Sequence, residues 1–144
     1  MKELTIRIGE KLPKKGELRE FEKKYKIKLP VSFAEFLLKQ NPVYTEECYF
    51  FAHGRTFGIG FMPFVKGGKG SAIQKAMEIH FVSFFDKKYI PFGMDSGGWL
   101  FVISVQKVDY GLVYFARTDS ELTEALTLLA ADFDDFIDNL KSEY

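Results

Sequence analysis

Apolar side chains recur every three or four positions in two segments near the amino end of the chain. Residues 16–30 carry them among charged residues, and residues 30–40 carry them along one face. Both spacings predict amphipathic helices, and Pro30 suits the first turn of the second because proline fixes a helical φ. Asn41-Pro42 ends that helix, so we expect two helices that pack together. The positions that share the two faces are Leu18, Phe21 and Tyr25, and Phe33, Phe36, Leu37 and Gln40.

An alternating pattern replaces the helical one in the middle of the chain. In residues 48–65 aromatic side chains alternate with small or polar ones and Gly54 marks a turn, which predicts a strand hairpin. Residues 90–105 predict two more strands, and residues 111–117 another. Strands joined by short links pair in antiparallel fashion. We therefore expect a mostly antiparallel sheet of about five or six strands flanked by helices, an α+β fold in one domain over residues 1–144.

Residues 66–81 begin as a glycine-rich loop and continue with helical spacing. Ser71 is a candidate N-cap for a helix of about ten residues. A phosphate-binding loop is disfavoured, because that motif needs Lys directly before Ser or Thr, and here Gly70 separates Lys69 from Ser71. We interpret the segment as a surface loop followed by a helix. The positions on the predicted helical face are Ile73, Ala76, Met77 and His80.

The carboxyl end contains one ambiguous and one clear helical pattern. In residues 118–130 leucines fit a helix while threonines disfavour one, and we predict a helix. In residues 132–144 an apolar face is preceded by Asp132, a good N-cap. That face consists of Phe133, Phe136, Ile137 and Leu140. The side chains predicted to face water are Asp134, Asp135 and Asp138.

The sequence Asp95-Ser96-Gly97-Gly98 lies between two apolar runs and could be an active-site loop or a turn. Asp and Ser bend the backbone through side-chain hydrogen bonds, and Gly supplies positive φ without steric cost. A catalytic role for Asp95 needs a second group, but residues 90–105 contain no His, Lys, Cys or second carboxylate. We interpret Asp95, Gly97 and Gly98 as a structural turn.

The formal net charge is zero, but charges separate along the chain. Residues 1–28 carry ten Lys or Arg and five Glu, whereas residues 117–144 carry two basic and eight acidic side chains. Either the ends attract one another or they present opposite poles to partners. The basic end makes nucleic-acid binding an alternative, although interleaved glutamates and the lack of a recognisable DNA or RNA motif argue against it. The lysines concerned are Lys14, Lys15, Lys23, Lys24, Lys26 and Lys28.

Cys48 is the one cysteine of the chain, which excludes an internal disulfide and a thiolate metal cluster. The start of the sequence lacks the apolar core of a signal peptide and no run is long enough to span a membrane, so we expect a cytoplasmic protein. Neither His53 nor His80 has a ligand at metal-motif spacing. We therefore expect no metal, no cofactor and no catalytic residue, and we predict that the chain is not an enzyme.

Three motifs, in order over residues 16–140, resemble the SUKH superfamily. Leu29-Pro30 opens the second helix, residues 90–99 form a hairpin that begins Ile-Pro and contains Asp-Ser-Gly-Gly, and residues 130–140 end the domain. The chain departs from the family pattern at Asn41-Pro42, where Asn-Gly is common. The matched positions are Pro30 as helix start, Asp95, Gly97 and Gly98 as turn, and Phe133 and Phe136 as core.

The resemblance implies an α+β protein that acts by binding, since the superfamily includes fungal cell-wall regulators and many bacterial immunity proteins that neutralise polymorphic toxins. It implies no shared catalytic residue. An immunity protein would occlude a toxin's active site or substrate channel, and an acidic surface would steer it to the basic clefts of toxins that act on nucleic acids.

We therefore name Asp134, Asp135 and Asp138 as candidate residues for binding a protein toxin. Nucleic-acid binding and a housekeeping interaction without a toxin are the alternatives. The sequence leaves open whether aromatic side chains such as Tyr49, Phe51 and Phe57 belong to the core or to a binding surface.

Overall fold

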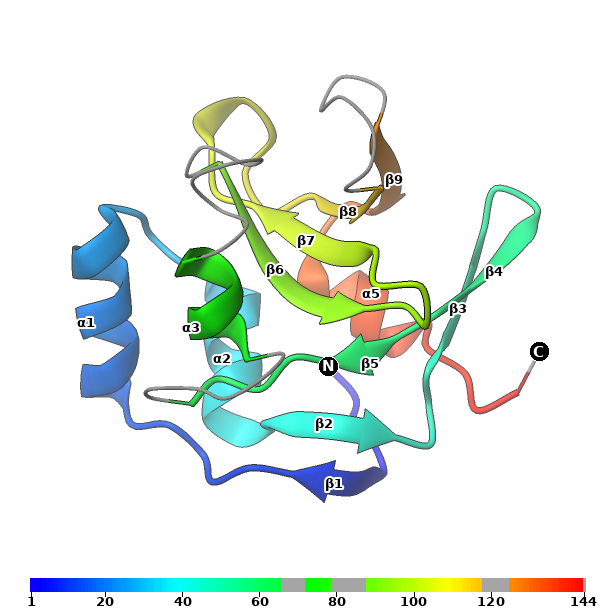
Figure 1. Ribbon diagram of the computed structural model, residues 1–144, viewed down its shortest axis with the longest axis horizontal. Helices are drawn as coiled ribbons and strands as arrows, with labels where there is room; N and C mark the ends of the chain where they lie inside the picture. Colours follow the sequence, from blue (N-terminus) through cyan, green and yellow to red (C-terminus); the bar gives the residue numbers. More distant parts are fainter. Residues whose placement is uncertain (66–71, 79–87, 118–124, 144) are drawn as a thin grey trace.

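The computed structural model of the chain describes residues 1–65, 72–78, 88–117 and 125–143. The glycine-rich loop, Ser71, His80 and the first part of the segment predicted as a helix at 118–130 lie outside the described residues. The described parts form an α+β fold with an antiparallel sheet, as the sequence predicts (Figure 1).

The central feature is a five-stranded antiparallel sheet with the order β5-β6-β7-β8-β9. Two short antiparallel pairs, β1–β2 and β3–β4, accompany it. The sheet strands are β5 Gly60–Phe61, β6 Tyr89–Met94, β7 Leu100–Ser104, β8 Val113–Ala116 and β9 Leu126–Ala130. The shorter pairs are formed by β1 Ile6–Gly9 with β2 Pro42–Thr45, and by β3 Tyr49–Ala52 with β4 Arg55–Gly58.

The two predicted amino-terminal helices are confirmed, with the predicted buried faces. The first ends at Lys26, which takes the left-handed conformation with φ 54° and donates its amide to Glu22. The helices are α1 Lys15–Tyr25, α2 Val31–Lys39, α3 Ile73–Ala76 and α5 Phe133–Asp138, with a 3-10 turn η2 at Lys107–Asp109. In Figure 1, α1 lies at the far end of the molecule from the β3–β4 hairpin.

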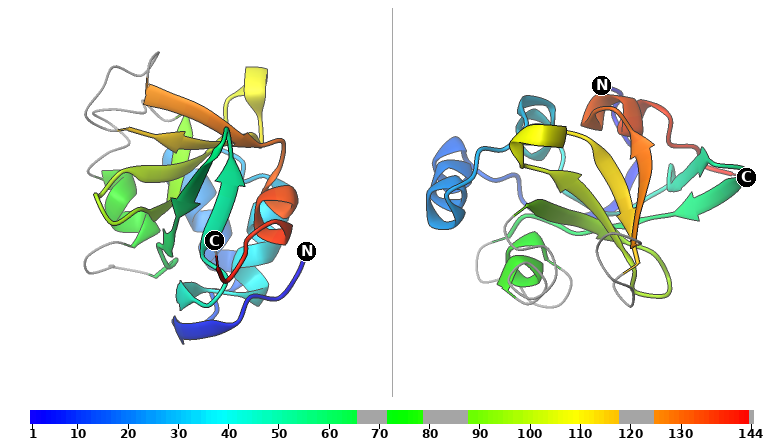
Figure 2. Two further views of the ribbon diagram at one scale, coloured as in Figure 1. Left: turned by 90° about the vertical axis from the view of Figure 1, so that its right-hand side faces the viewer. Right: turned by 90° about the horizontal axis from the view of Figure 1, so that it is seen from above.

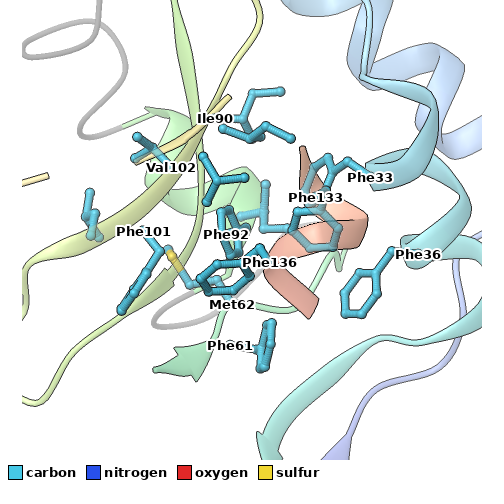
Figure 3. Packing of buried hydrophobic residues seen from close by; sticks show 14 of the residues in the cluster. Phe33, Phe36, Phe61, Met62, Ile90, Phe92, Phe101, Val102, Phe133 and Phe136 are labelled. Atoms are coloured by element: carbon cyan, nitrogen blue, oxygen red, sulfur yellow. The ribbon is translucent and has the colours of Figure 1, made fainter. Parts of the chain in front are cut away.

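Aromatic rings fill the core between α2, α5 and the sheet (Figure 3). The ring of Phe133 lies 4.9 Å from those of Phe33 and Phe36 on α2 and 5.1 Å from that of Phe92 on β6. Tilted and edge-on ring pairs at such distances add about 0.5–1.5 kcal/mol each to the burial of their surface. The many phenylalanines of the sequence are therefore largely core residues, and α5 joins the helices to the sheet.

The β3–β4 hairpin turns at His53 and Gly54, whose φ values of 53° and 71° are both positive. Two such residues make the tight turn that suits the twist of a hairpin. On its inner face Phe50 stacks on Phe136 of α5 at 4.8 Å and Phe57 packs against Phe115 of β8 at 5.1 Å. Figure 2 (left) shows α5 beside this hairpin.

The connection after α2 has Asn41-Pro42 where the family commonly has Asn-Gly, and the Asn41 side chain stabilises this connection. Its side-chain amide donates to the carbonyls of Lys11 and Phe64, and its Oδ1 accepts the Phe64 amide at 2.8 Å. The buried side chain thus satisfies its hydrogen bonds while Pro42 begins β2. The Asn-Pro sequence therefore ends the helix and leads directly into a strand.

One predicted helix is wrong, and a second is described only in part. Residues 126–130, which were predicted to be helical, form the strand β9. This strand pairs with β8 in the register Tyr114↔Leu128 and Phe115↔Thr127. The hydrogen bonds and packing of this pairing outweigh the local preference for a helix. The helix predicted after the glycine-rich loop has Ala72 in the N-cap position that was predicted for Ser71, and α3 covers Ile73–Ala76, with residues 79–87 outside the described ranges. Of its predicted face, Ile73, Ala76 and Met77 are buried, and His80 lies outside the described residues.

Candidate functional site

A groove of about 870 Å³ runs along β4 and β5. Its lining includes residues of β2 and of the turn between β6 and β7, two segments that lie on opposite sides of β5 in Figure 1. Side chains that shape it are Tyr44, Tyr49, Arg55, Phe57, Met94 and Phe115. Because aromatic and arginine side chains carry much of the binding energy in protein interfaces, the groove is the candidate site.

Two glycines of the groove lining, Gly58 and Gly60, place no side chain in the groove. A Cβ added to Gly58 would lie 3.7 Å from the Tyr49 ring, and one added to Gly60 would lie 3.9 Å from the Tyr44 ring. Tyr44 is 58% exposed, and Tyr49 is half-buried. Glycine within a strand often marks a place where another backbone approaches closely. The two tyrosines and two glycines therefore form a surface that an incoming chain can contact.

Arg55 lies at the start of β4 with its guanidinium over two buried rings. Its Cζ atom is 4.2 Å from the centroid of Phe57 and 5.7 Å from that of Phe115. The cation–π contact orients the guanidinium while the side chain stays exposed. The Arg55 guanidinium makes no hydrogen bond or ion pair to another described residue, so within the described parts its donors lack a polar partner.

The turn with Asp95 forms the opposite wall. Its Oδ1 accepts hydrogen bonds from the amides of Gly97 and Trp99 at 3.0 and 2.9 Å, and the Gly98 amide donates to its carbonyl. Gly98 has a φ of 88°, whereas Gly97 does not have positive φ. Asp95 and Gly98 therefore build the turn, and Ser96 beside them lines the groove.

The acidic helix α5 lies outside the groove lining. Asp132 caps it by accepting the Asp135 amide at 2.7 Å. Asp135 and Asp138 are exposed as predicted, and Asp138 accepts the backbone amide of Lys2 at 2.7 Å. This contact joins the amino end of the chain to α5 through a backbone amide, and no ion pair links the two charged ends among the described residues.

Asp134 differs from the other aspartates of α5. Asp134 is partly buried, and its Oδ1 atom is buried with no hydrogen-bond partner among the residues that the structure describes. The prediction that it faces water is therefore only partly right. The role of Asp134, Asp135 and Asp138 in binding a partner stays a prediction.

Cys48 and His53 have structural surroundings. Cys48 is partly buried beside the groove, and burial raises the pKa of its thiol, with the nearby Glu47 charge adding to the effect and a Tyr49 hydrogen bond opposing it. A raised pKa disfavours the reactive thiolate. His53 Nε2 donates to the Leu128 carbonyl at 2.5 Å, which ties the hairpin turn to β9.

Within the described ranges, no cluster of three His, Cys, Asp or Glu side chains could hold a metal ion. Likewise, none of the helices described has the length and apolar character that a bilayer crossing requires.

The sequence patterns did not indicate Tyr44, Arg55, Gly58 and Gly60 as site residues. A signal existed in the sequence of residues 54–61, where glycines at 58 and 60 fall on one face of an extended segment between aromatic residues. The aromatic side chains of the β3–β4 hairpin belong partly to the core and partly to the surface. Phe57 is buried, whereas Phe51 is 43% exposed and Tyr49 lines the groove.

The fold and the groove define a class of α+β domain in which an antiparallel sheet with flanking helices presents an aromatic surface. The chain belongs to the SMI1/KNR4 family (SUKH-1), whose family model matches residues 12–139. This match confirms the resemblance that the three sequence motifs indicate.

A solved structure supports the fold. The crystal structure of a protein from Pseudomonas syringae pv. tomato is similar with a TM-score of 0.56 and 17% sequence identity, over 85% of this chain and 76% of that one. At this identity the similarity concerns the fold alone. A search of curated proteins finds no significant match.

Proposed function

We propose that this chain is a non-enzymatic protein-binding domain, an immunity protein that neutralises a bacterial toxin by binding and occluding it. The observation that carries the proposal is the groove along β4 and β5, with its exposed tyrosine and fixed arginine. The SUKH family, which includes toxin immunity proteins, supports the same role. The domain would act in the cytoplasm, where Cys48 stays reduced.

The composition of the groove suits a protein partner more than a small substrate. Tyr and Arg are enriched among residues that dominate protein interfaces, whereas an active site needs a paired nucleophile, base or metal ion. Cys48 is the one nucleophilic thiol in the lining, and its raised pKa opposes reactivity. Acidic residues on α5 would act at a distance by steering a basic partner.

The proposal expects a toxin domain encoded next to this gene, and co-expression with that domain tests it. Wild-type chain should restore growth and co-purify with the toxin domain in a stable complex. Failure to bind that toxin domain, with growth still arrested, would contradict the immunity role. A screen of the purified chain for nuclease, hydrolase and transferase turnover should be blank, and turnover abolished by His53→Ala or Cys48→Ala would show an enzyme instead.

A further inference from the structure

β4 has one edge paired with β3 and a second edge that faces the groove. In an antiparallel pair, residues that exchange hydrogen bonds alternate with residues whose N–H and C=O point away. Ala52 and Arg55 flank the two-residue turn and are hydrogen-bonded, so the pairs Phe51↔Thr56 and Tyr49↔Gly58 are not. Thr56 and Gly58 therefore direct their backbone groups away from β3.

Hydrogen bonds on both sides of β3 confirm this alternation. Tyr49 uses its outward backbone groups to bind Lys141, with N···O distances of 3.0 and 2.8 Å. The Ile59 amide, the next position after Gly58, donates back to the Cys48 carbonyl at 2.9 Å. Both contacts require that Gly58 turn its N–H and C=O toward the groove.

The outward backbone groups of Thr56 and Gly58 have no partner among the described residues. Both residues are half-buried, so these groups are only partly hydrated. Just beyond them, Gly60 on β5 pairs with Met94, the last residue of β6. A strand placed beside β4 would therefore lie where β6 would continue if the chain did not turn at Asp95.

The charged residues of the groove lining indicate which side chains the added strand should have. Arg55, the basic side chain in the described lining, has no carboxylate partner among the described residues, while Glu10 and Asp95 supply negative charge elsewhere in the groove. A carboxylate opposite Arg55 would form a charge-assisted, bidentate pair. A second carboxylate beside Asp95 would be repelled.

We propose that the open edge of β4 binds an extended segment of the partner protein as an added strand, with an acidic side chain of that segment on Arg55. The segment pairs with the backbone groups of Thr56 and Gly58 and lays alternate side chains against Tyr44 and Tyr49. This inference rests on the proposed function, because it names the part of the partner that the groove receives. Strand addition to a sheet edge is a general mode of peptide recognition.

Selection from a displayed library of random dodecamer peptides on the immobilised chain provides the probe. Selected peptides should share an acidic residue within an alternating apolar pattern. Thr56→Pro removes an outward N–H without removing a β3–β4 hydrogen bond, and it should weaken peptide binding about tenfold or more. Thr56→Val keeps the N–H and is the matched control, which should lose far less affinity than Thr56→Pro. Arg55→Gln should weaken only peptides that carry the acidic residue.

Peptide chemistry gives a second test that does not depend on the folding of the proline variant. N-methylation at alternate amides of a selected peptide should abolish binding in one register and spare it in the other, because only alternate amides face β4. Equal loss or equal tolerance in both registers would overturn strand pairing.

Other outcomes also decide the matter. Peptides that bind Thr56→Pro as well as wild type, or a library with no enriched peptide, would overturn the proposal. Dimerisation of the chain that Thr56→Pro abolishes would identify a second copy as the occupant and overturn it too. A toxin that still binds Thr56→Pro would reject this inference alone, whereas a toxin that does not bind the wild type rejects the proposed function.

Discussion

At the scale of single residues, Gly97 and Gly98 of the β6–β7 turn differ in backbone conformation, so substitutions at the two positions should differ in their effect on stability. Gly98 has a φ of 88°, which a side chain strains, whereas a Cβ at Gly97 would make an ordinary 3.5 Å contact with Asp95 Oδ1. Gly98→Ala should lower the free energy of unfolding by about 1–2 kcal/mol. Gly97→Ala should change it by less than about 0.5 kcal/mol. Urea unfolding measures both, and equal effects would show that the turn is not built on Gly98.

A second residue-scale prediction concerns Tyr114, whose hydroxyl donates to Asp109 Oδ2 at 2.7 Å. Burial raises the pKa of Tyr114, and the hydrogen bond to Asp109 and the Asp109 and Tyr89 charges raise it further. Its contribution to stability is therefore full below the unfolded pKa of about 10 and is lost as pH rises above that value. Tyr114→Phe should flatten the loss of unfolding free energy above pH ~10, as measured by denaturant unfolding across pH. An unchanged slope would contradict the prediction.

At the scale of elements, the hydrophobic periodicity of the sequence predicted helices and strands correctly where the tertiary contacts of a segment favour the same conformation as its local sequence. The amino-terminal helices and the helix at 133–138 have apolar faces that the core buries directly. The strand at 126–130 could not be predicted in this way, because its leucines also fit a helix and only the unpaired edge of β8 decides between them. The groove escaped prediction for the same reason, since it joins β2, β4 and a distant turn.

The N-cap of α5 gives an element-scale prediction. Asp132 satisfies the Asp135 amide at the start of a short helix whose Phe133 and Phe136 are fully buried. Asp132→Ala should lower the free energy of unfolding by about 1 kcal/mol, whereas Asp132→Asn keeps an acceptor and should cost much less. Thermal unfolding of the two variants distinguishes them. Identical melting temperatures would mean that the cap does not stabilise α5.

For the whole molecule, the separated charges predict how a partner approaches. If the acidic helix steers a basic partner, then changing Asp134, Asp135 and Asp138 to Asn should slow association, most clearly at low salt, because exposed charges act mainly on the encounter rate. The melting temperature serves as the control for folding. An association rate that is unchanged at low salt would show that these three aspartates do not steer the partner.

The same charges allow a test of the nucleic-acid alternative. Lys23, Lys24 and Lys26 are exposed at the end of α1. If they bind nucleic acid, changing them to Gln should abolish DNA or RNA retention in a gel shift at about 50 mM salt, where phosphate contacts are strong. The protein-binding account expects no retention by the wild type. Salt-sensitive retention lost in the Lys variant would favour nucleic-acid binding instead.

Calorimetric titration of the toxin domain into two glycine variants tests the central claim, that the groove along β4 and β5 binds the partner. Gly58→Leu places a side chain in the groove beside Tyr49 at ordinary contact distance, whereas Gly16→Leu adds the same atoms on α1, where no neighbour lies within 4 Å. If the partner occupies the groove, Gly58→Leu should raise Kd about tenfold or more, while Gly16→Leu should bind like the wild type. Wild-type affinity in Gly58→Leu would contradict it.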